Sequence, residues 1–133
     1  MAEPVKTILL VEDEAIIAID EARSIGELGY RVVTASSGEA AVRIALVEET
    51  VDLILMDIDL GRGMDGTDAA REILNVRAIP VVFLSSHTEK EIVEKTEKIT
   101  SYGYVVKNSG ITVLDASLKM AFRLFEVNGK LRA

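Results

Sequence analysis

The segment ILLVED, residues 8–13, joins a wholly apolar run to two acidic residues. A second segment, LILMD at residues 53–57, repeats this arrangement with a single aspartate. Runs that are apolar throughout are typical of strands covered on both faces, as in a parallel sheet. The two segments therefore predict buried parallel strands that end at carboxylate side chains.

Further apolar runs follow at residues 81–84 and 104–106, with a more alternating run at 30–35. Between the runs lie stretches such as 16–28 and 41–47, in which apolar side chains recur every three or four positions, as in amphipathic helices. Alternation of strands and helices is the α/β pattern. We expect about five strand–helix units around a parallel sheet.

Three local signals mark helix ends. Ser36 with Glu39, and Thr88 with Glu91, have the spacing of a capping box, in which two side chains satisfy backbone N–H groups at a helix start. Gly29 follows the first helical stretch, where a glycine commonly ends a helix. These signals agree with the alternation of strands and helices.

A chain of 133 residues has room for one domain, because domains average roughly 150 residues. We expect residues 1–127 to form it, with a last helix from about residue 111 to residue 126. Residues 128–133 would be a C-terminal tail, or the start of a linker in a longer chain.

The composition excludes several kinds of site. The chain has no Cys, which removes disulfides and Cys-ligated metal centres, and its single His87 leaves no multi-His metal site. With 15 basic and 22 acidic residues the net charge is −7, which repels nucleic acid and anionic lipid. No uncharged apolar run approaches the roughly 18 residues that span a bilayer. We therefore expect a soluble, cytoplasmic protein that binds neither nucleic acid nor membranes directly.

Chemically capable residues follow four of the apolar runs: Glu12, Asp13, Asp57, Ser85 and Lys107. Because the carboxyl ends of parallel strands share one edge of a sheet, where open α/β folds bind ligands, we expect these side chains to meet. Carboxylates brought close together repel one another unless a cation compensates, and carboxylate oxygens suit Mg²⁺. The sequence therefore predicts a Mg²⁺ site.

A carboxylate beside a metal can also act as a nucleophile toward phosphorus and form an aspartyl phosphate. Lys107 could then neutralise one phosphoryl oxygen, and the Ser85 hydroxyl could donate a hydrogen bond to another.

From about Val5 to Phe125 the sequence resembles the receiver domain of two-component response regulators, the family of the chemotaxis receiver. The resemblance rests on the strand-end residues named above and on the segment YVVK, residues 104–107. It implies a doubly wound (βα)5 flavodoxin-like three-layer sandwich, with five parallel strands in the order 2-1-3-4-5. Receivers commonly follow the lysine with a cis proline, whereas this chain has Asn108, so a cis peptide is not expected there.

The resemblance implies that Asp57 accepts a phosphoryl group from a phosphohistidine on a sensor kinase or phosphotransfer protein. Asp13 would ligate Mg²⁺ directly, and Glu12 would do so directly or through a water. Asp57 and the backbone carbonyl of Asp59 would complete the protein ligands. Lys107 would contact Asp57 and then the phosphoryl group.

Ser85 and Tyr104 would be the switch residues. Ser85 would move to bond a phosphoryl oxygen and Tyr104 would turn inward behind it, which changes the surface of the fourth helix, fifth strand and fifth helix. Such domains usually signal through that surface, to a downstream protein or a fused output domain, and a homodimer could form there. The domain would catalyse only its own phosphorylation and dephosphorylation, so we do not expect an enzyme unless the chain is part of a larger kinase.

Two other functions remain open. Asp57 and Asp59 resemble the acid pair of haloacid-dehalogenase-type phosphatases, although that family places its pair after the first strand and usually needs a longer chain. A passive flavodoxin-like cofactor binder also fits the architecture. However, the acidic residues 12–14 would repel the phosphate that such proteins hold with hydroxyls and backbone amides.

Overall fold

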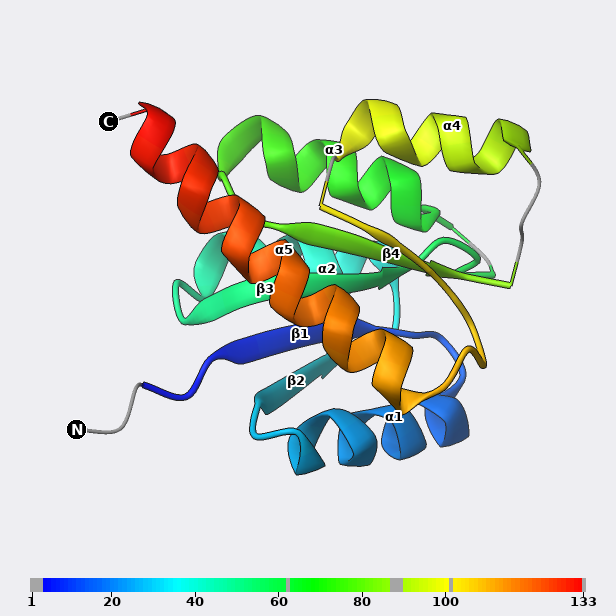
Figure 1. Ribbon diagram of the computed structural model, residues 1–133. Coiled ribbons are helices and arrows are strands. Elements are labelled where there is room, and N and C mark those ends of the chain that lie inside the picture. Colours follow the sequence, from blue (N-terminus) through cyan, green and yellow to red (C-terminus); the bar gives the residue numbers. More distant parts are fainter. Residues whose placement is uncertain (1–3, 62, 87–89, 101, 133) are drawn as a thin grey trace.

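The computed structural model describes residues 4–61, 63–86, 90–100 and 102–132. In these residues five strands alternate with five helices (Figure 1). The elements are β1 (Thr7–Val11), α1 (Ala15–Glu27), β2 (Arg31–Ala35), α2 (Gly38–Val47), β3 (Val51–Asp57), α3 (Gly66–Val76), β4 (Val81–Ser85), α4 (Lys90–Ile99), β5 (Tyr104–Val106) and α5 (Ile111–Arg132).

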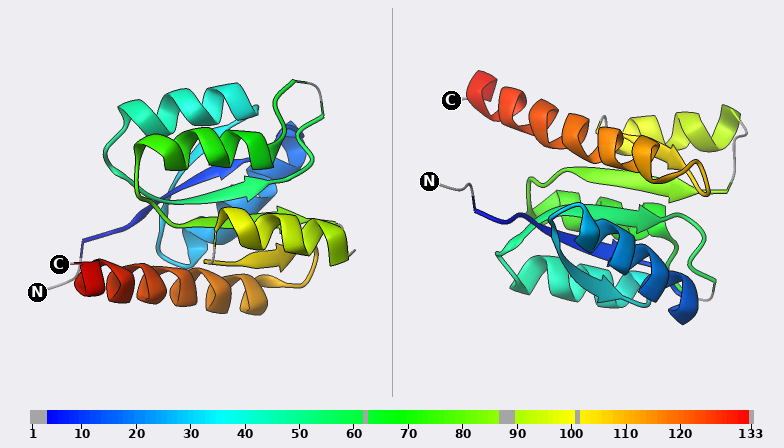
Figure 2. Two further views of the ribbon diagram at one scale, coloured as in Figure 1. Left: turned by 90° about the horizontal axis from the view of Figure 1, so that it is seen from above. Right: turned by 60° about the horizontal axis from the view of Figure 1, so that its bottom comes forward.

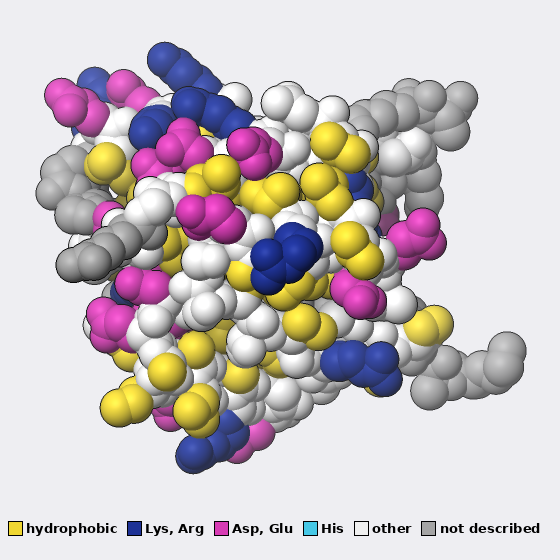
Figure 3. Space-filling model, turned by 180° about the vertical axis from the view of Figure 1, so that it is seen from behind, with side chains coloured by type: hydrophobic (Ala, Val, Ile, Leu, Met, Phe, Trp, Pro, Cys, Tyr) yellow, Lys and Arg dark blue, Asp and Glu magenta, His cyan; other side chains and the backbone are white. Residues whose placement is uncertain are grey.

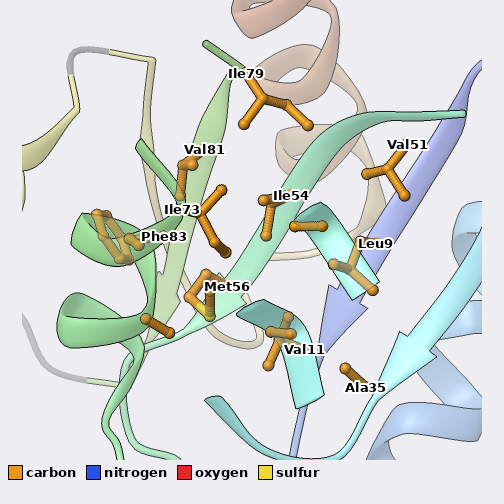
Figure 4. Close-up of a cluster of buried hydrophobic side chains, with 14 of the residues drawn as sticks. Leu9, Val11, Ala35, Val51, Ile54, Met56, Ile73, Ile79, Val81 and Phe83 are labelled. Carbon is orange, nitrogen blue, oxygen red and sulfur yellow. The ribbon is translucent and has the colours of Figure 1, made fainter. Parts of the chain in front are cut away.

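The strands form one parallel sheet in the order β2-β1-β3-β4-β5, which confirms the flavodoxin-like α/β fold. Helices α2, α3 and α4 pack on one face of the sheet, and α1 and α5 pack on the other (Figure 2). The core is accordingly split into two clusters. Figure 4 shows the first, in which alternate side chains of β1, β3 and β4 meet α3.

The central strands are buried from end to end. Every residue of β1 and β4 is buried, and in β3 only Asp52 retains partial exposure. Because helices cover both faces, the middle of each of these strands is apolar on both faces, and polar residues lie only at or near the strand ends. Strand β2 lies at an edge and is half exposed, as its alternating sequence predicts.

The structure differs from the sequence prediction at two helix ends. The N-cap of α2 is Ser37, not Ser36, because the extended Ser37 accepts a hydrogen bond from the Ala40 N–H at 3.1 Å. The last helix runs to Arg132 instead of ending near residue 126. No proline interrupts it, and the Asn128 side chain donates to the Tyr102 hydroxyl at 2.7 Å. The helix therefore continues through residues 128–132, which were expected to belong to a tail.

Three further local predictions concern Gly29, the peptide bond at Asn108 and the helix cap at Thr88. Gly29 follows α1 with φ 103°, the left-handed conformation that glycine favours. No cis peptide bond occurs in the described residues, and Asn108 instead turns the chain with φ 65°. The predicted cap at Thr88 lies outside the described residues, as does His87.

Arg77, directly after α3, ties the end of α2 to the start of β3. Its Nη1 donates to the carbonyls of Ala45 and Glu48 at 2.7 and 3.1 Å. Its Nη2 donates to the carbonyl of Glu49 at 3.2 Å and to that of Val51. One planar guanidinium thus satisfies two carbonyls at the end of α2 that lack helical partners, and also two carbonyls between that end and the first residue of β3.

We expect Arg77→Ala to lower the free energy of unfolding by about 2 kcal/mol, because hydrogen bonds from a charged donor are lost. Arg77→Lys should recover less than half of this loss, since an ammonium lacks the planar fork. Urea denaturation checks both values. Full recovery by lysine would show that charge alone matters at this position.

Candidate functional site

The carboxyl ends of the strands bring the predicted side chains together at one edge of the sheet. Val11 pairs with Met56, Asp57 with Leu84, and Ser85 with Val106. Beyond the last pairs, backbone hydrogen bonds continue the ladder, from Glu12 to Ala35, from Ile58 to Leu84 and from Lys107 to Ser85. Glu12, Asp57 and Lys107 are therefore held by the sheet itself and not by loops.

Lys107 bridges two buried carboxylates. Its Nζ lies 2.8 Å from Oδ2 of Asp57 and 3.4 Å from Oε2 of Glu12. The side chains of Asp57 and Glu12 are fully buried, whereas that of Lys107 is 21% exposed. Burial alone would lower the pKa of Lys107, but the hydrogen bond from Lys107 to Asp57 and the charges of both acids raise it. The lysine is accordingly held as a cation.

Glu12 has a strongly raised pKa. Burial, together with a hydrogen bond and charge repulsion from Asp57, raises its pKa from 4.5 to about 8. Lys107 and the N–H of Glu14, which donates to Oε1 at 3.3 Å, act in the opposite direction without cancelling the shift. One lysine therefore does not fully compensate the acids around it.

Glu12, Asp13 and Asp57 form a candidate metal site. Each offers a carboxylate oxygen, and these oxygens all lie within 4.8 Å of one another. Asp13 is exposed, so solvent reaches the cluster from its side. Three carboxylates against one ammonium leave an excess of negative charge, and hard oxygen donors in this number suit Mg²⁺ with retained waters. The donor set fits a divalent cation.

Asp59 enters the site through its backbone. Its N–H donates to Oδ1 of Asp57 at 2.9 Å, so both carboxylate oxygens of Asp57 accept hydrogen bonds. The Asp59 side chain is exposed, and its carboxylate is outside the cluster of acids found in the described residues. Its backbone carbonyl as a metal ligand stays a prediction.

Ser85 and Tyr104 lie on adjacent strands. Ser85 ends β4 and is fully buried, and its backbone carbonyl accepts from the Lys107 N–H at 2.8 Å. Tyr104 begins β5 and packs, partly buried, against the core cluster that α2, α3 and α4 cover. Their switching roles stay predictions.

Two glycines shape the site, and sequence reasoning missed the part that Gly66 plays. A Cβ on Gly66, the first residue of α3, would lie 2.0 Å from the backbone oxygen of Asp57. A Cβ on Gly61, which has φ 69°, would lie 2.9 Å from Oδ2 of Asp13. The loop after β3 therefore folds back tightly over the acids. The only sequence signal was its glycine content.

A cavity of about 590 Å³ opens beside the site, between α1 and the segment that joins β5 to α5. Lys107, Leu84 and Leu114 line it, together with Glu21. Oε1 of Glu21 is buried and accepts no hydrogen bond from any residue that the structure describes. Burial raises the pKa of Glu21, although the charge of Lys107 opposes the shift. The lysine is thus approachable from the α1 side.

A family model and a curated protein both match most of this chain. The family model for the response regulator receiver domain matches residues 8–119. The transcriptional regulatory protein PdtaR of Mycobacterium tuberculosis is 35% identical over 121 residues, which are 90% of this chain and 58% of PdtaR. The chain thus spans a little over half the length of that curated relative.

Solved structures are also similar to this chain over most of its length. The N-terminal domain of a response regulator/sensory box/GGDEF protein from Carboxydothermus hydrogenoformans is 46% identical, with a TM-score of 0.85 over 92% of this chain and 98% of that one. A receiver domain protein from Clostridium thermocellum has the same TM-score and coverages at 22% identity, which supports the fold alone.

The raised pKa of Glu12 predicts a pH effect on metal-free protein. Between pH 4.5 and about 8 the unfolded chain has lost the Glu12 proton and the folded chain has kept it, so the free energy of unfolding falls as pH rises. Glu12→Gln should remove this contribution and flatten the curve in that range. Denaturation in chelator at several pH values checks it, with the exposed Glu14→Gln as control. Parallel curves for wild type and Glu12→Gln would contradict the prediction.

Proposed function

The chain belongs to the response regulator receiver domain family, and from that premise we propose that it is a phosphoacceptor module of two-component signalling. Asp57 takes the phosphoryl group from a phosphohistidine of a sensor kinase or phosphotransfer protein. The observation that carries this is the buried Asp57 carboxylate, which lies 2.8 Å from the Lys107 ammonium and against the acids Glu12 and Asp13.

The chemistry follows from these groups. A carboxylate oxygen of Asp57 forms a bond to phosphorus while the P–N bond of the phosphohistidine breaks and the imidazole leaves with the bonding electrons. The product is an acyl phosphate on Asp57. Lys107 already touches Oδ2 of this carboxylate, so it can follow the developing negative charge onto the phosphoryl oxygens.

Glu12, Asp13 and Asp57 would hold Mg²⁺, with the backbone carbonyl of Asp59 as a further ligand. When bound, Mg²⁺ supplies positive charge that offsets the mutual repulsion of carboxylates and phosphoryl oxygens. Among the protein groups, the Ser85 hydroxyl donates to a phosphoryl oxygen after transfer, and Tyr104 turns inward behind it. Ser85 and Tyr104 lie on neighbouring strands, where Tyr104 pairs with Phe83, two residues before Ser85.

The output is a change in the surface of α4, β5 and α5, recognised by a downstream protein or a fused output domain. A fused domain is supported by the length of PdtaR, of which this chain matches 58%. Direct nucleic-acid binding is not supported, because the net charge is −7 and the face in Figure 3 intersperses basic with acidic side chains. No helix in the described part of the chain is long and apolar enough to cross a membrane. Receiver domains are usually cytoplasmic, and we propose the same location for this chain.

The site favours this function over the two alternatives. A haloacid-dehalogenase-type phosphatase would need the Asp59 carboxylate beside Asp57, whereas the acids clustered with Asp57 in the described residues are Glu12 and Asp13. A flavodoxin-like binder would need a phosphate pocket where Glu12 and Asp13 now concentrate negative charge.

Intact mass after incubation with Mg²⁺ and acetyl phosphate tests the proposal. We expect one added phosphoryl group that hydroxylamine removes, and none with chelator or in Asp57→Asn. The matched control is Asp59→Asn, which should still be phosphorylated because it keeps the backbone N–H that donates to Asp57. Absence of the adduct in folded wild-type protein would refute the proposal. Turnover of p-nitrophenyl phosphate that disappears in Asp59→Asn would favour the phosphatase.

Removing a metal ligand is a separate prediction. Asp13→Asn leaves the buried pair of Lys107 and Asp57 intact but removes an exposed carboxylate from the cluster. We expect its Mg²⁺ affinity, measured by calorimetry, to fall about tenfold or more, on the order of 1.4 kcal/mol. The exposed Asp68→Asn on α3 should bind as wild type does, and equal affinities in all three proteins would contradict the assignment.

A further inference from the structure

Glu21 is a carboxylic acid on the side of α1 that packs toward the sheet. It lies four residues after Ile17 and four before Ile25, and residues at this spacing share one side of a helix. Ile25 is fully buried in the core, so an apolar residue is expected between the two. Instead, Oε1 of Glu21 is buried and accepts no hydrogen bond from the described residues. Packing alone does not account for Glu21, because burying a carboxyl oxygen without a partner costs free energy.

Lys107 is the cation that acts on Glu21. Both residues line the cavity of about 590 Å³ between α1 and the segment that joins β5 to α5. Burial raises the pKa of Glu21, and among the charges that act on it the largest effect comes from Lys107, which lowers the pKa. The charges of Asp57 and Asp20 act in the opposite direction and more weakly. Glu21 and Lys107 therefore attract each other across the cavity.

The ammonium of Lys107 has room for a further acceptor. It carries three N–H donors. Two acceptors are Oδ2 of Asp57 at 2.8 Å and Oε2 of Glu12 at 3.4 Å, and the latter distance is long for a hydrogen bond from an ammonium. A carboxylate oxygen on the cavity side can therefore bind the same ammonium without displacing Asp57.

Glu21 differs from the two acids that contact Lys107 in its relation to the candidate metal site. Glu12 and Asp57 both belong to that site, whereas Glu21 is outside the cluster found in the described residues. A carboxylate that ligates a divalent cation attracts a neighbouring ammonium less, and the two cations repel each other. Glu21 is thus an acceptor for Lys107 that metal binding does not engage.

We propose that Glu21 is a positioning residue, whose carboxylate accepts a hydrogen bond from the Lys107 ammonium when Glu12 and Asp57 ligate Mg²⁺. Lys107 is then held between Glu21 and the phosphoryl group on Asp57, where its charge offsets that of the phosphoryl oxygens. Glu21 itself contacts neither the metal nor the phosphoryl group. The inference rests on the proposed function, because it concerns the role of Lys107 in phosphoryl transfer.

Glu21→Leu separates this role from packing, since leucine is of similar size and suits the apolar walls of the cavity. We expect its free energy of unfolding in urea to equal or exceed that of wild type, because a buried carboxyl group is removed. Its rate of phosphorylation by acetyl phosphate at saturating Mg²⁺, followed by intact mass, should nevertheless fall about tenfold, the scale of one lost hydrogen bond from a charged donor. Mg²⁺ affinity, measured by calorimetry, should not change.

Two matched variants complete this test. Glu21→Gln keeps an amide oxygen as acceptor and should restore most of the rate. Asp20→Asn removes the same charge from an exposed residue of the same cavity and should react as wild type does. Equal rates in wild type and Glu21→Leu would overturn the proposal. So would an equal loss of rate in Asp20→Asn, which would show an effect of charge alone.

NMR of the lysine side-chain nitrogens gives a readout that does not depend on phosphorylation. At saturating Mg²⁺ the ammonium protons of Lys107 should exchange with solvent more slowly in wild type and Glu21→Gln than in Glu21→Leu, because the hydrogen bond protects them. Lys107→Arg identifies the signal by its loss. Identical exchange in wild type and Glu21→Leu would refute the role of Glu21. Wild type that takes no phosphoryl group would refute the proposed function instead, and the exchange rates would still decide the role of Glu21.

Discussion

The ammonium of Lys107 lies between two carboxylates that have no exposed surface of their own. A buried charge without a partner costs several kcal/mol, and the lysine that reaches both acids, together with the backbone N–H groups of Asp59 and Glu14, offsets this cost. The reach depends on the parallel ladder, which continues past β1, β3 and β5 through the N–H groups of the residues that follow. The sheet thus fixes the positions of Glu12, Asp57 and Lys107. The acids of the site outnumber its one ammonium, and this excess of negative charge favours the binding of a divalent cation.

Much of the fold could be predicted from the sequence because strands buried on both faces appear in it as uninterrupted apolar runs. A strand such as β3, covered by helices on both sides, cannot carry polar residues except at its ends. The same reasoning places an acid or a lysine after such a run at the edge of the sheet. The convergence of Glu12, Asp57 and Lys107 was therefore predictable, although the hydrogen bond between Lys107 and Glu12 was not.

Features that depend on contacts with backbone groups far away in the sequence could not be predicted in this way. The four carbonyls bound by Arg77 come from the end of α2 and the start of β3, and no sequence pattern near residue 77 predicts these contacts. Gly66 matters because the backbone of Asp57 passes where a side chain would be. Two adjacent serines made the start of α2 ambiguous by one residue. The end of α5 was misplaced because its last turns are held by Tyr102, a residue outside the helix.

The hydrogen bond between Asn128 and Tyr102 also has a mechanical meaning. Tyr102 precedes Tyr104, the first residue of β5, by two positions, and its ring packs against Phe125 of α5 with centroids 5.7 Å apart. The C-terminal turns of the longest helix are therefore anchored, by one hydrogen bond and one ring contact, to a residue only two positions before β5.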